Sequence, residues 1–243
     1  MMPVIDWQNP VWWTHTALWS GLTIVLYRLA IRLSHWCRGH PLAIPILTAT
    51  IMLVAILLLT HTDHTDYEQG TSVLLFLMAP ALVVLAVPMR QQMQRLRQIW
   101  WPLTIALLAG SVTAIVSAVL IAWALGADEA MLVSFIPKSA TSPIAISVVA
   151  PLGGIPAITA LLVCATGIAG AILARPLLSL LKWNDDTVRG VAVGTAAHAV
   201  GTAREMQDSP VAGAYAALAM SLNGLLTAVL TPLVAWLLHL LVS

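Results

Sequence analysis

Six stretches of this chain are apolar over a length that matches the thickness of a lipid bilayer. An α-helix needs about 20 apolar residues to cross the hydrocarbon core of a membrane. Charged residues make up only 9% of the 243 residues, too few to cover the surface of a water-soluble domain of this size. The sequence therefore predicts a single domain over residues 1–243, an all-α, polytopic membrane helix bundle. Its six clear spans run near residues 12–31, 42–60, 71–89, 101–124, 155–174 and 212–240.

The formal net charge of the chain is +1 at pH 7, so a nucleic-acid partner is not expected. The sequence has no P-loop, no dinucleotide-binding glycine fingerprint and no HExxH motif, so we expect neither enzyme activity nor a cofactor. One loop carries two histidines and two aspartates: His61, Asp63, His64 and Asp66. Such a group could hold a divalent metal, but a solvated polar loop is far commoner, and we predict no metal site.

Basic residues are grouped in the loops after the first and third apolar stretches. They are Arg28, Arg32, Arg38, Arg90, Arg95 and Arg97. The loops at 1–10, 61–70 and 126–130 contain no Lys or Arg. Because short cytoplasmic loops are enriched in Lys and Arg, we expect the arginine-rich loops in the cytoplasm and both termini outside.

Two further apolar segments, near 131–151 and 189–206, are interrupted. Pro137 and Pro143 each remove a backbone hydrogen-bond donor from the first segment. In lipid, such a break survives only where protein or a water-filled cavity satisfies the freed backbone groups. Each segment either crosses the membrane as a broken helix or turns back as a re-entrant hairpin. Two hairpins would enter from opposite faces and meet near the middle of the membrane.

Polar residues gather at the first break. Lys138 places a positive charge within an apolar stretch, and hydroxyl groups follow at Ser139, Thr141 and Ser142. One interpretation is that Lys138 reaches the interface and the hydroxyls cap helix ends. The other is a binding site, because charged residues inside membrane segments are candidates for function.

Small and polar residues recur at helical spacing in the second segment. Gly194, His198 and Gly201 follow one another at steps of four and three residues, and Thr195 and Thr202 share the helix face of His198. An imidazole can donate to an anion or carry a proton near neutral pH. The alternative is a tight helix–helix contact in which His198 bonds a neighbouring carbonyl.

Arg204 closes the second segment, either as an interfacial pair with Glu205 or as an anchor for an anion. A guanidinium suits a carboxylate because it makes two parallel hydrogen bonds, and helix N-termini at the breaks would also favour negative charge. We predict a binding site for a small anion formed by Lys138, Ser139, Thr141, Ser142, Thr195, His198, Thr202 and Arg204. The predicted structural breaks are Pro137, Pro143, Gly194 and Gly201.

These segments resemble the LrgB/CidB family of antiholin-like membrane proteins, and the resemblance covers nearly the whole chain. Pro137–Ala145, Gly153–Pro156 and Gly194–Arg204 are similar to the signature stretches of that family, and Ala79–Pro88 is similar to another recurrent stretch. The chain departs from the pattern at Ala79, where the family usually has glycine. It also has Ala196 and Ala197 where the family often has small hydroxyl residues.

The resemblance implies two functions. Bacterial members are described as antiholin-like regulators of murein hydrolase export and cell lysis, encoded beside a small holin-like membrane protein of the LrgA/CidA type. Plant relatives are plastidal glycolate/glycerate translocators, and some bacterial pairs are linked to pyruvate uptake. The resemblance also implies an antiporter-like fold with discontinuous helices and a location in the bacterial plasma (inner) membrane. We also expect a homodimer in the lipid bilayer.

The residues in the broken segments favour transport, because a regulator that only docks on a partner needs no Lys138 or His198 there. We therefore predict a carrier of small carboxylates of the pyruvate or glycolate type, coupled to a proton or another ion. In this hypothesis Lys138 and Arg204 attract the carboxylate, the hydroxyl residues bind its oxygens, and His198 carries the coupled proton. The alternative is a lysis regulator that acts with an LrgA/CidA-type partner and uses the polar residues for packing.

Overall fold

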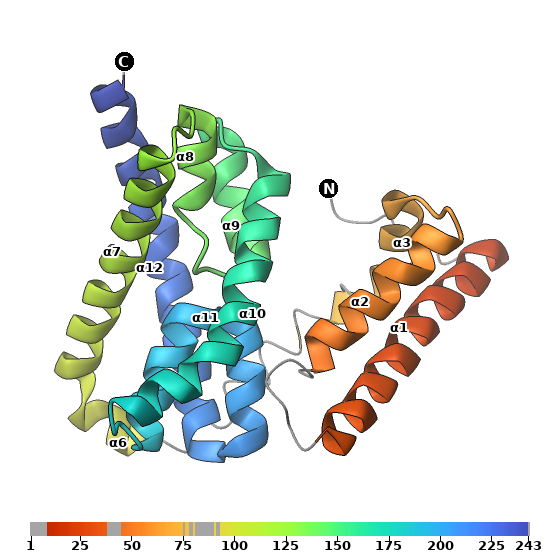
Figure 1. Cartoon of the computed structure of the whole chain (residues 1–243), viewed down its shortest axis with the longest axis horizontal. Helices are drawn as coiled ribbons and strands as arrows, with labels where there is room; N and C mark the ends of the chain where they lie inside the picture. Colours follow the sequence, from red (N-terminus) through yellow and green to blue (C-terminus); the bar gives the residue numbers. More distant parts are fainter. Residues whose placement is uncertain are drawn as a thin grey trace. The chain divides into compact units, whose positions relative to one another are not determined.

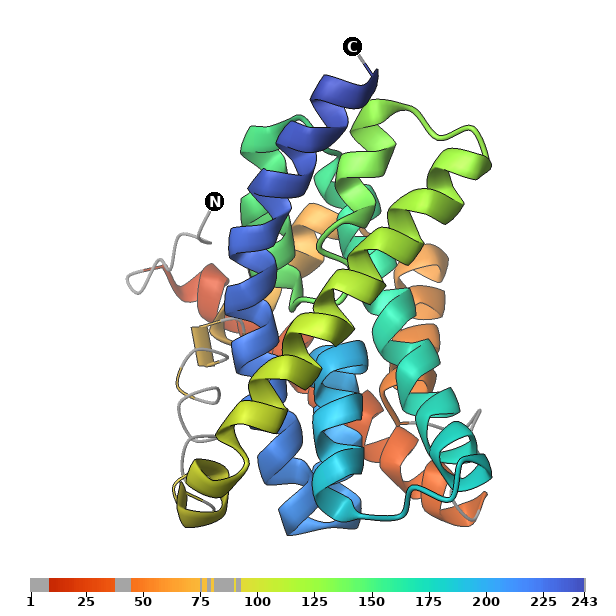
Figure 2. The same ribbon diagram turned by 90° about the vertical axis from the view of Figure 1, so that its left-hand side faces the viewer.

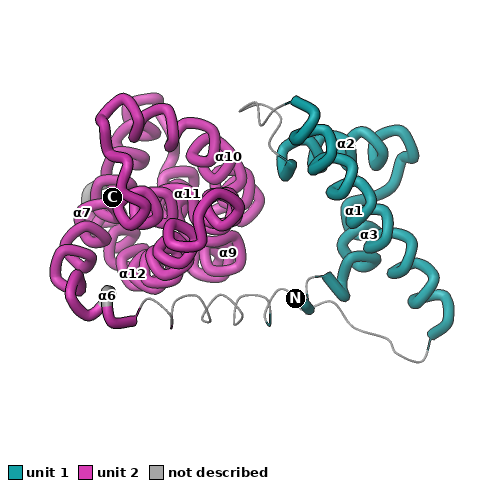
Figure 3. Tube along the Cα trace, turned by 90° about the horizontal axis from the view of Figure 1, so that it is seen from below, with its two compact units in different colours: residues 1–84 teal, residues 85–243 magenta. Residues whose placement is uncertain are grey.

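The computed structural model describes residues 9–37, 45–74, 76–77, 80, 90 and 93–242. The chain divides into two compact units, residues 1–84 and 85–243 (Figure 3). In the described residues every regular element is a helix, which confirms the all-α prediction. The prediction of a single domain over the whole chain stays a prediction.

The first unit contains three helices, labelled in Figure 1: α1 (Pro10–Trp36), α2 (Pro45–Leu59) and α3 (His64–Gly70). Trp19 of α1 packs edge-on against Tyr67 of α3, with ring centroids 5.7 Å apart. Ser20 Oγ donates to the carbonyl of Gly70 at 3.0 Å. These contacts hold α3 against the middle of α1, while many apolar side chains of α1 and α2 remain exposed, as lipid-facing surfaces require.

The second unit is built around three long helices that run from one end of it to the other (Figures 1 and 2). They are α7 (Trp100–Ala124), α10 (Pro156–Leu180) and α12 (Pro210–Val242), and the short α6 (Met93–Gln98) precedes them. Between α7 and α10 lie α8 (Glu129–Phe135), α9 (Ser142–Val149) and the 3-10 turn η1 (Ala150–Leu152). Between α10 and α12 lies α11 (Asp186–Asp208).

Four of the described helices are long and apolar enough to cross a membrane: α1, α7, α10 and α12. They cover the predicted spans at 12–31, 101–124, 155–174 and 212–240. Within the stretch at 42–60 the described residues form α2, a shorter apolar helix of 15 residues. The stretch at 71–89 lies largely outside the described residues. A multi-pass helical membrane protein is thus supported, but six spans are not confirmed.

Residues 129–155, which we call the first hairpin, enter the second unit beside the end of α7 and turn back at residues 136–141. Ser134 Oγ of α8 accepts a hydrogen bond from the backbone amide of Ile155 at 2.7 Å. The carbonyl of Ser134 accepts from Thr159 Oγ1 of α10 at 3.2 Å. Because α8 begins, and the hairpin ends, at the same end of the unit, the segment turns back within the unit.

Residues 186–208 form a second hairpin, because α11 reverses at His198. His198 has φ 39° and ψ −133°, which are not helical angles. Arg189 Nε lies 2.6 Å from Glu205 Oε2, although these residues are 16 positions apart. A continuous helix would separate them by roughly 24 Å. The first arm (186–197) and second arm (199–208) therefore lie side by side, and the hairpin enters from the end opposite to the first (Figure 2).

This reversal corrects two expectations about the second segment. The prediction of one continuous polar helix face from Gly194 to Thr202 is wrong, since residues before and after His198 lie on different arms. The break falls at His198 and not at the glycines. Gly201 instead lets the arms approach, because a Cβ there would lie 2.6 Å from Cβ of Ala197 and Cγ1 of Val193. Gly194 similarly packs on the backbone of Ala216 in α12.

Candidate functional site

The tips of the two hairpins meet inside the second unit at one side chain of α12. Asn223 Nδ2 donates to the carbonyl of Ser139 at 3.0 Å and to the carbonyl of Thr195 at 3.2 Å. Asn223 Oδ1 accepts from Ser111 Oγ of α7 at 2.5 Å. Ser111 and Asn223 lie well inside the long helices α7 and α12. Of the two arrangements considered for these segments, broken helices or hairpins, the contacts match two hairpins whose tips meet inside the unit.

Asn223 suits this position because its amide carries two N–H donors. Ser139 lies in the turn of the first hairpin and Thr195 lies three residues before His198, so both carbonyls are close to an interruption of helical bonding. An unpaired backbone group in an apolar interior costs several kcal/mol. Asn223 was not predicted, although an amide within the apolar stretch near 212–240 was the signal that could have identified it.

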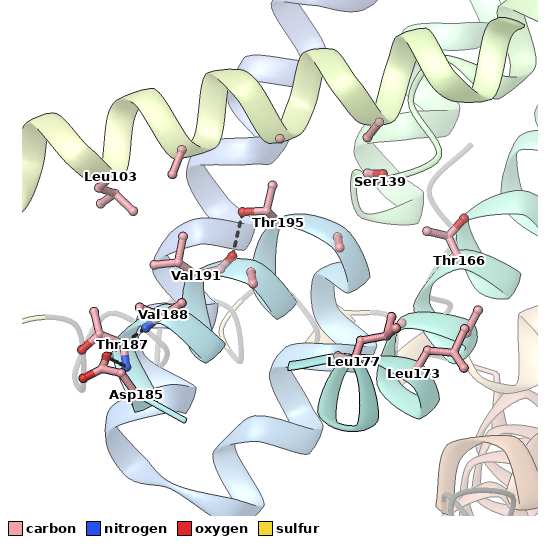
Figure 4. Close-up of a pocket in the computed structure, with 18 of the residues that line it drawn as sticks. Leu103, Ser139, Thr166, Leu173, Leu177, Asp185, Thr187, Val188, Val191 and Thr195 are labelled. Atoms are coloured by element: carbon pink, nitrogen blue, oxygen red, sulfur yellow. Dashed lines mark hydrogen bonds between the residues drawn. The ribbon is translucent and has the colours of Figure 1, made fainter. Parts of the chain in front are cut away.

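A cavity of about 960 Å³ leads to these tips (Figure 4). Its walls come from α7, α10, the first arm of α11 and the tip of the first hairpin. Ile99 and Asp185 line it at the end of the unit where α7 and α11 begin, so we call this end the mouth. Lys138 and Ser139 line its inner end. Most of the wall is apolar, and its polar side chains are Lys138, Ser139, Thr166, Asp185, Thr187 and Thr195.

Lys138 is the one cationic side chain among the described residues that line this cavity. Its Nζ lies 3.5 Å from Ser139 Oγ. In the described part of the chain, no carboxylate forms an ion pair with it. A charge in largely apolar surroundings is costly unless an opposite charge accompanies it. The inner end of the cavity therefore favours a bound anion.

The hydroxyl groups beside Lys138 are not equivalent. Ser139 Oγ is within reach of the Lys138 ammonium as an acceptor, which leaves its own hydrogen to donate. Thr195 Oγ1 already donates to the carbonyl of Val191 at 2.8 Å, so its hydrogen is committed within the helix. Thr166 of α10 also lines the cavity and was not predicted, since a single threonine in an apolar span carries little signal. Lys138 and Ser139 are thus the main donors for an anion.

His198 lies at the turn of the second hairpin, but it is buried and does not line the cavity. Its Nε2 lies 2.8 Å from the carbonyl of Val163 in α10. A carbonyl can only accept, so Nε2 carries the hydrogen in this arrangement. Gly167 makes room for the ring, because a Cβ there would lie 2.6 Å from Cε1 of His198. This geometry matches the helix-contact interpretation, and the proton-carrying role stays a prediction.

The remaining predicted residues lie away from the cavity wall. Thr202 Oγ1 donates to the carbonyl of His198 at 2.7 Å and so supports the turn. Arg204 Nε lies 3.3 Å from Asp208 Oδ2, and Arg175 of α10 reaches the same carboxylate oxygen at 2.7 Å.

The other predicted residues of the first hairpin also lie outside the cavity lining. Thr141 and Ser142 lie where α9 begins, and Pro143 is in the first turn of that helix. Pro137 lies in the turn of the hairpin. The cavity thus brings together Lys138, Ser139 and Thr195 from the predicted set.

This arrangement is chemically suited to a small anion. It offers one ammonium, at least one free hydroxyl and apolar walls. Within the described residues, no group of three or more His, Cys, Asp or Glu side chains is placed to hold a metal ion. The His61 to Asp66 loop, in the first unit, is included in that statement.

Comparison with known proteins places this chain among membrane proteins of one family. Residues 23–237 match the model of the LrgB-like family. A Bacillus subtilis (strain 168) protein named Uncharacterized protein YxaC is 34% identical over 218 residues, which cover 90% of this chain and 94% of that protein. Antiholin-like protein LrgB of Bacillus mycoides (strain KBAB4) and of Bacillus cereus (strain B4264) are each 28% identical over 212 residues, 87% of this chain and 92% of theirs. No solved structure matches the chain.

Proposed function

The chain belongs to the LrgB-like family of antiholin-like, multi-pass membrane proteins, and from that premise we propose that it is a carrier of small carboxylates. The proposed substrates are of the pyruvate or glycolate type. The proposed mechanism is alternating access, in which the site between the hairpin tips faces one side of the membrane at a time. The proposed location is the bacterial plasma membrane.

One observation carries this proposal: a cavity that begins at one end of the unit and stops inside it at a lone lysine. Lys138 and Ser139 close its inner end, and no acidic partner neutralises Lys138 among the described residues. A bound carboxylate would supply the missing charge and accept from both groups. A protein that acts only through contacts on its outer surface has no need of such a cavity.

Charge distribution supports a cytoplasmic mouth. Arg97 just precedes α7, and Lys182 lies between α10 and α11, so both belong to the end of the unit where the mouth lies. Basic residues beside a membrane span favour the cytoplasmic side. The described state would then be open inward. Since α12 runs from that end to the other, its C-terminus would lie outside, as we predicted.

Coupling to a proton or another ion is part of the proposal, with His198 as the candidate proton carrier. In the described state His198 Nε2 already donates to the Val163 carbonyl, and the ring is separated from the cavity wall. Proton exchange at His198 would therefore require movement of the turn of the second hairpin. Such movement fits a carrier, because the turn is where α11 departs from helical geometry.

The second candidate function is regulation of murein hydrolase export and lysis together with a small LrgA/CidA-type membrane protein. It is favoured by the name of two of the relatives described above, Antiholin-like protein LrgB. In that case the exposed apolar faces of the helices would bind the partner, and Lys138 would have no role in binding a ligand. Formation of a homodimer is compatible with either function.

Uptake of labelled pyruvate and glycolate into liposomes that contain the purified protein tests the carrier proposal. We expect saturable uptake by the wild type and its loss in Lys138→Gln. The matched control is Lys182→Gln, which removes an exposed lysine outside the main cavity. Wild-type protein that is folded but moves neither carboxylate, alone or with the small partner protein, would contradict the proposal and favour the regulator.

A further inference from the structure

Asn223 joins three elements at the inner end of the cavity without lining the cavity itself. Its amide bonds Ser139 of the first hairpin, Thr195 of the second hairpin and Ser111 of α7. We propose that Asn223 is a positioning residue of the carrier, which fixes the Lys138–Ser139 tip against the first arm of α11. The anion then meets groups from both hairpins in one preformed site. This inference rests on the proposed function.

The orientation of the Asn223 amide follows from its partners. Ser111 Oγ has a hydrogen to donate, and it lies against Oδ1. The Ser139 and Thr195 carbonyls can only accept, and both lie against Nδ2. A flipped amide would bring Oδ1 against two carbonyl oxygens. The side chain therefore has one favourable orientation, and in that orientation it must bind both hairpins at once.

The two bonds to Nδ2 restrict how far the tips can separate. They measure 3.0 and 3.2 Å, and an N–H···O hydrogen bond weakens steeply beyond this range. Ser139 is the chain neighbour of Lys138, so any displacement of the Ser139 carbonyl also displaces the start of the Lys138 side chain. Loss of the amide would thus change the geometry of the anion site, although Asn223 is not itself one of the residues that line the cavity.

Two substitutions separate the donor function of Asn223 from its volume. Asn223→Leu keeps a side chain of similar size but removes all three hydrogen bonds. Asn223→Asp keeps the shape and the acceptor for Ser111, but places an oxygen against the two carbonyls. The matched control is Thr231→Val on the same helix. Thr231 is fully buried, and its hydroxyl donates within α12 to the carbonyl of Thr227 at 2.7 Å.

The test is the kinetics of labelled pyruvate uptake into liposomes, with rates expressed per folded carrier. A positioning role predicts that Asn223→Leu and Asn223→Asp raise KM at least about tenfold, because small displacements of binding groups are expensive. The maximal rate per folded carrier should change much less than KM. Thr231→Val should leave KM within about twofold of the wild type. Ser111→Ala removes one of the three hydrogen bonds that hold the amide and should also raise KM, by a smaller factor.

If the Asn223 variants have the KM of the wild type and differ only in the amount of folded protein, the positioning role is wrong and Asn223 is a structural residue. If neither Asn223 variant reaches the membrane, Ser111→Ala provides the test instead. An unchanged KM in Ser111→Ala would then overturn the positioning role. Binding is followed separately, as the shift in unfolding temperature caused by pyruvate. A wild type without saturable uptake and without such a shift would overturn the carrier proposal itself.

Discussion

Ser139 and Thr195 carry the same functional group on the same cavity wall, yet their hydrogen bonding differs. The Thr195 hydroxyl donates to Val191, whereas the Ser139 hydroxyl only accepts from Lys138. We therefore expect Ser139→Ala to weaken pyruvate binding by about 1.5–3 kcal/mol, the range for a hydrogen bond to a charged group. Thr195→Val should cost less than about 1 kcal/mol of binding. Titration of each variant with pyruvate checks this, and equal losses would contradict it.

His198 is held by packing as much as by its hydrogen bond. Gly167→Ala would place a Cβ 2.6 Å from Cε1 and 2.9 Å from Nε2 of the ring, so the ring must move away from the Val163 carbonyl. We expect this variant to be less stable by about 1–3 kcal/mol, the cost of overpacking or of an unsatisfied buried group.

The matched control for that variant is Gly21→Ala in α1, where nothing lies within 4 Å of an added Cβ. Unfolding in a denaturing-detergent titration compares the two. A Gly167→Ala protein as stable as Gly21→Ala would show that His198 is not confined in this way.

At the scale of elements, an ion pair between Arg189 and Glu205 closes the base of the second hairpin. These two residues are 16 positions apart, so their spacing in the sequence did not predict the pair. Arg189 on the first arm bonds Glu205 on the second at 2.6 Å and Asp186 at 2.9 Å. The Glu205 side chain is only 2% exposed. Because removal of one partner leaves a buried charge uncompensated, Glu205→Ala should destabilise the protein by about 3–5 kcal/mol.

Replacement of both partners of that ion pair provides the control. Arg189→Met combined with Glu205→Leu removes both charges and should recover much of the stability that Glu205→Ala loses. The midpoint of thermal unfolding of the purified variants measures the recovery. A double variant no more stable than Glu205→Ala would indicate that the two arms are held together by other contacts.

The elements that sequence patterns predicted well are those defined by length and composition. Apolar runs located α1, α7, α10 and α12, because burial in lipid depends on little else. Pro137 and Pro143 located the first hairpin, because proline interrupts helical bonding directly. The second hairpin was harder, since its reversal occurs at His198, and a histidine with φ 39° has no signature in the sequence.

At the scale of the whole molecule, the site depends on contacts between distant segments. Lys138 and Ser139 were predicted because a charge and hydroxyls stand out within apolar sequence. Asn223 was missed: its amide within an apolar stretch was a signal in the sequence, but its partners are known only once residues 139 and 195 are brought to it by the fold. Arg204 was assigned to the anion because a guanidinium suits a carboxylate, whereas in the structure it pairs with Asp208.

Binding of a small carboxylate in the cavity beside Lys138 can be tested by the protection of a nearby cysteine from a thiol reagent. Ala196 lines the cavity and is exposed, so Ala196→Cys, with Cys37 and Cys164 replaced by serine and alanine, reports on access to it. We predict that a membrane-impermeant reagent reacts from the side of the mouth, that pyruvate slows the reaction, and that Lys138→Gln abolishes this protection. Reaction that pyruvate does not slow, or equal protection without Lys138, would contradict it.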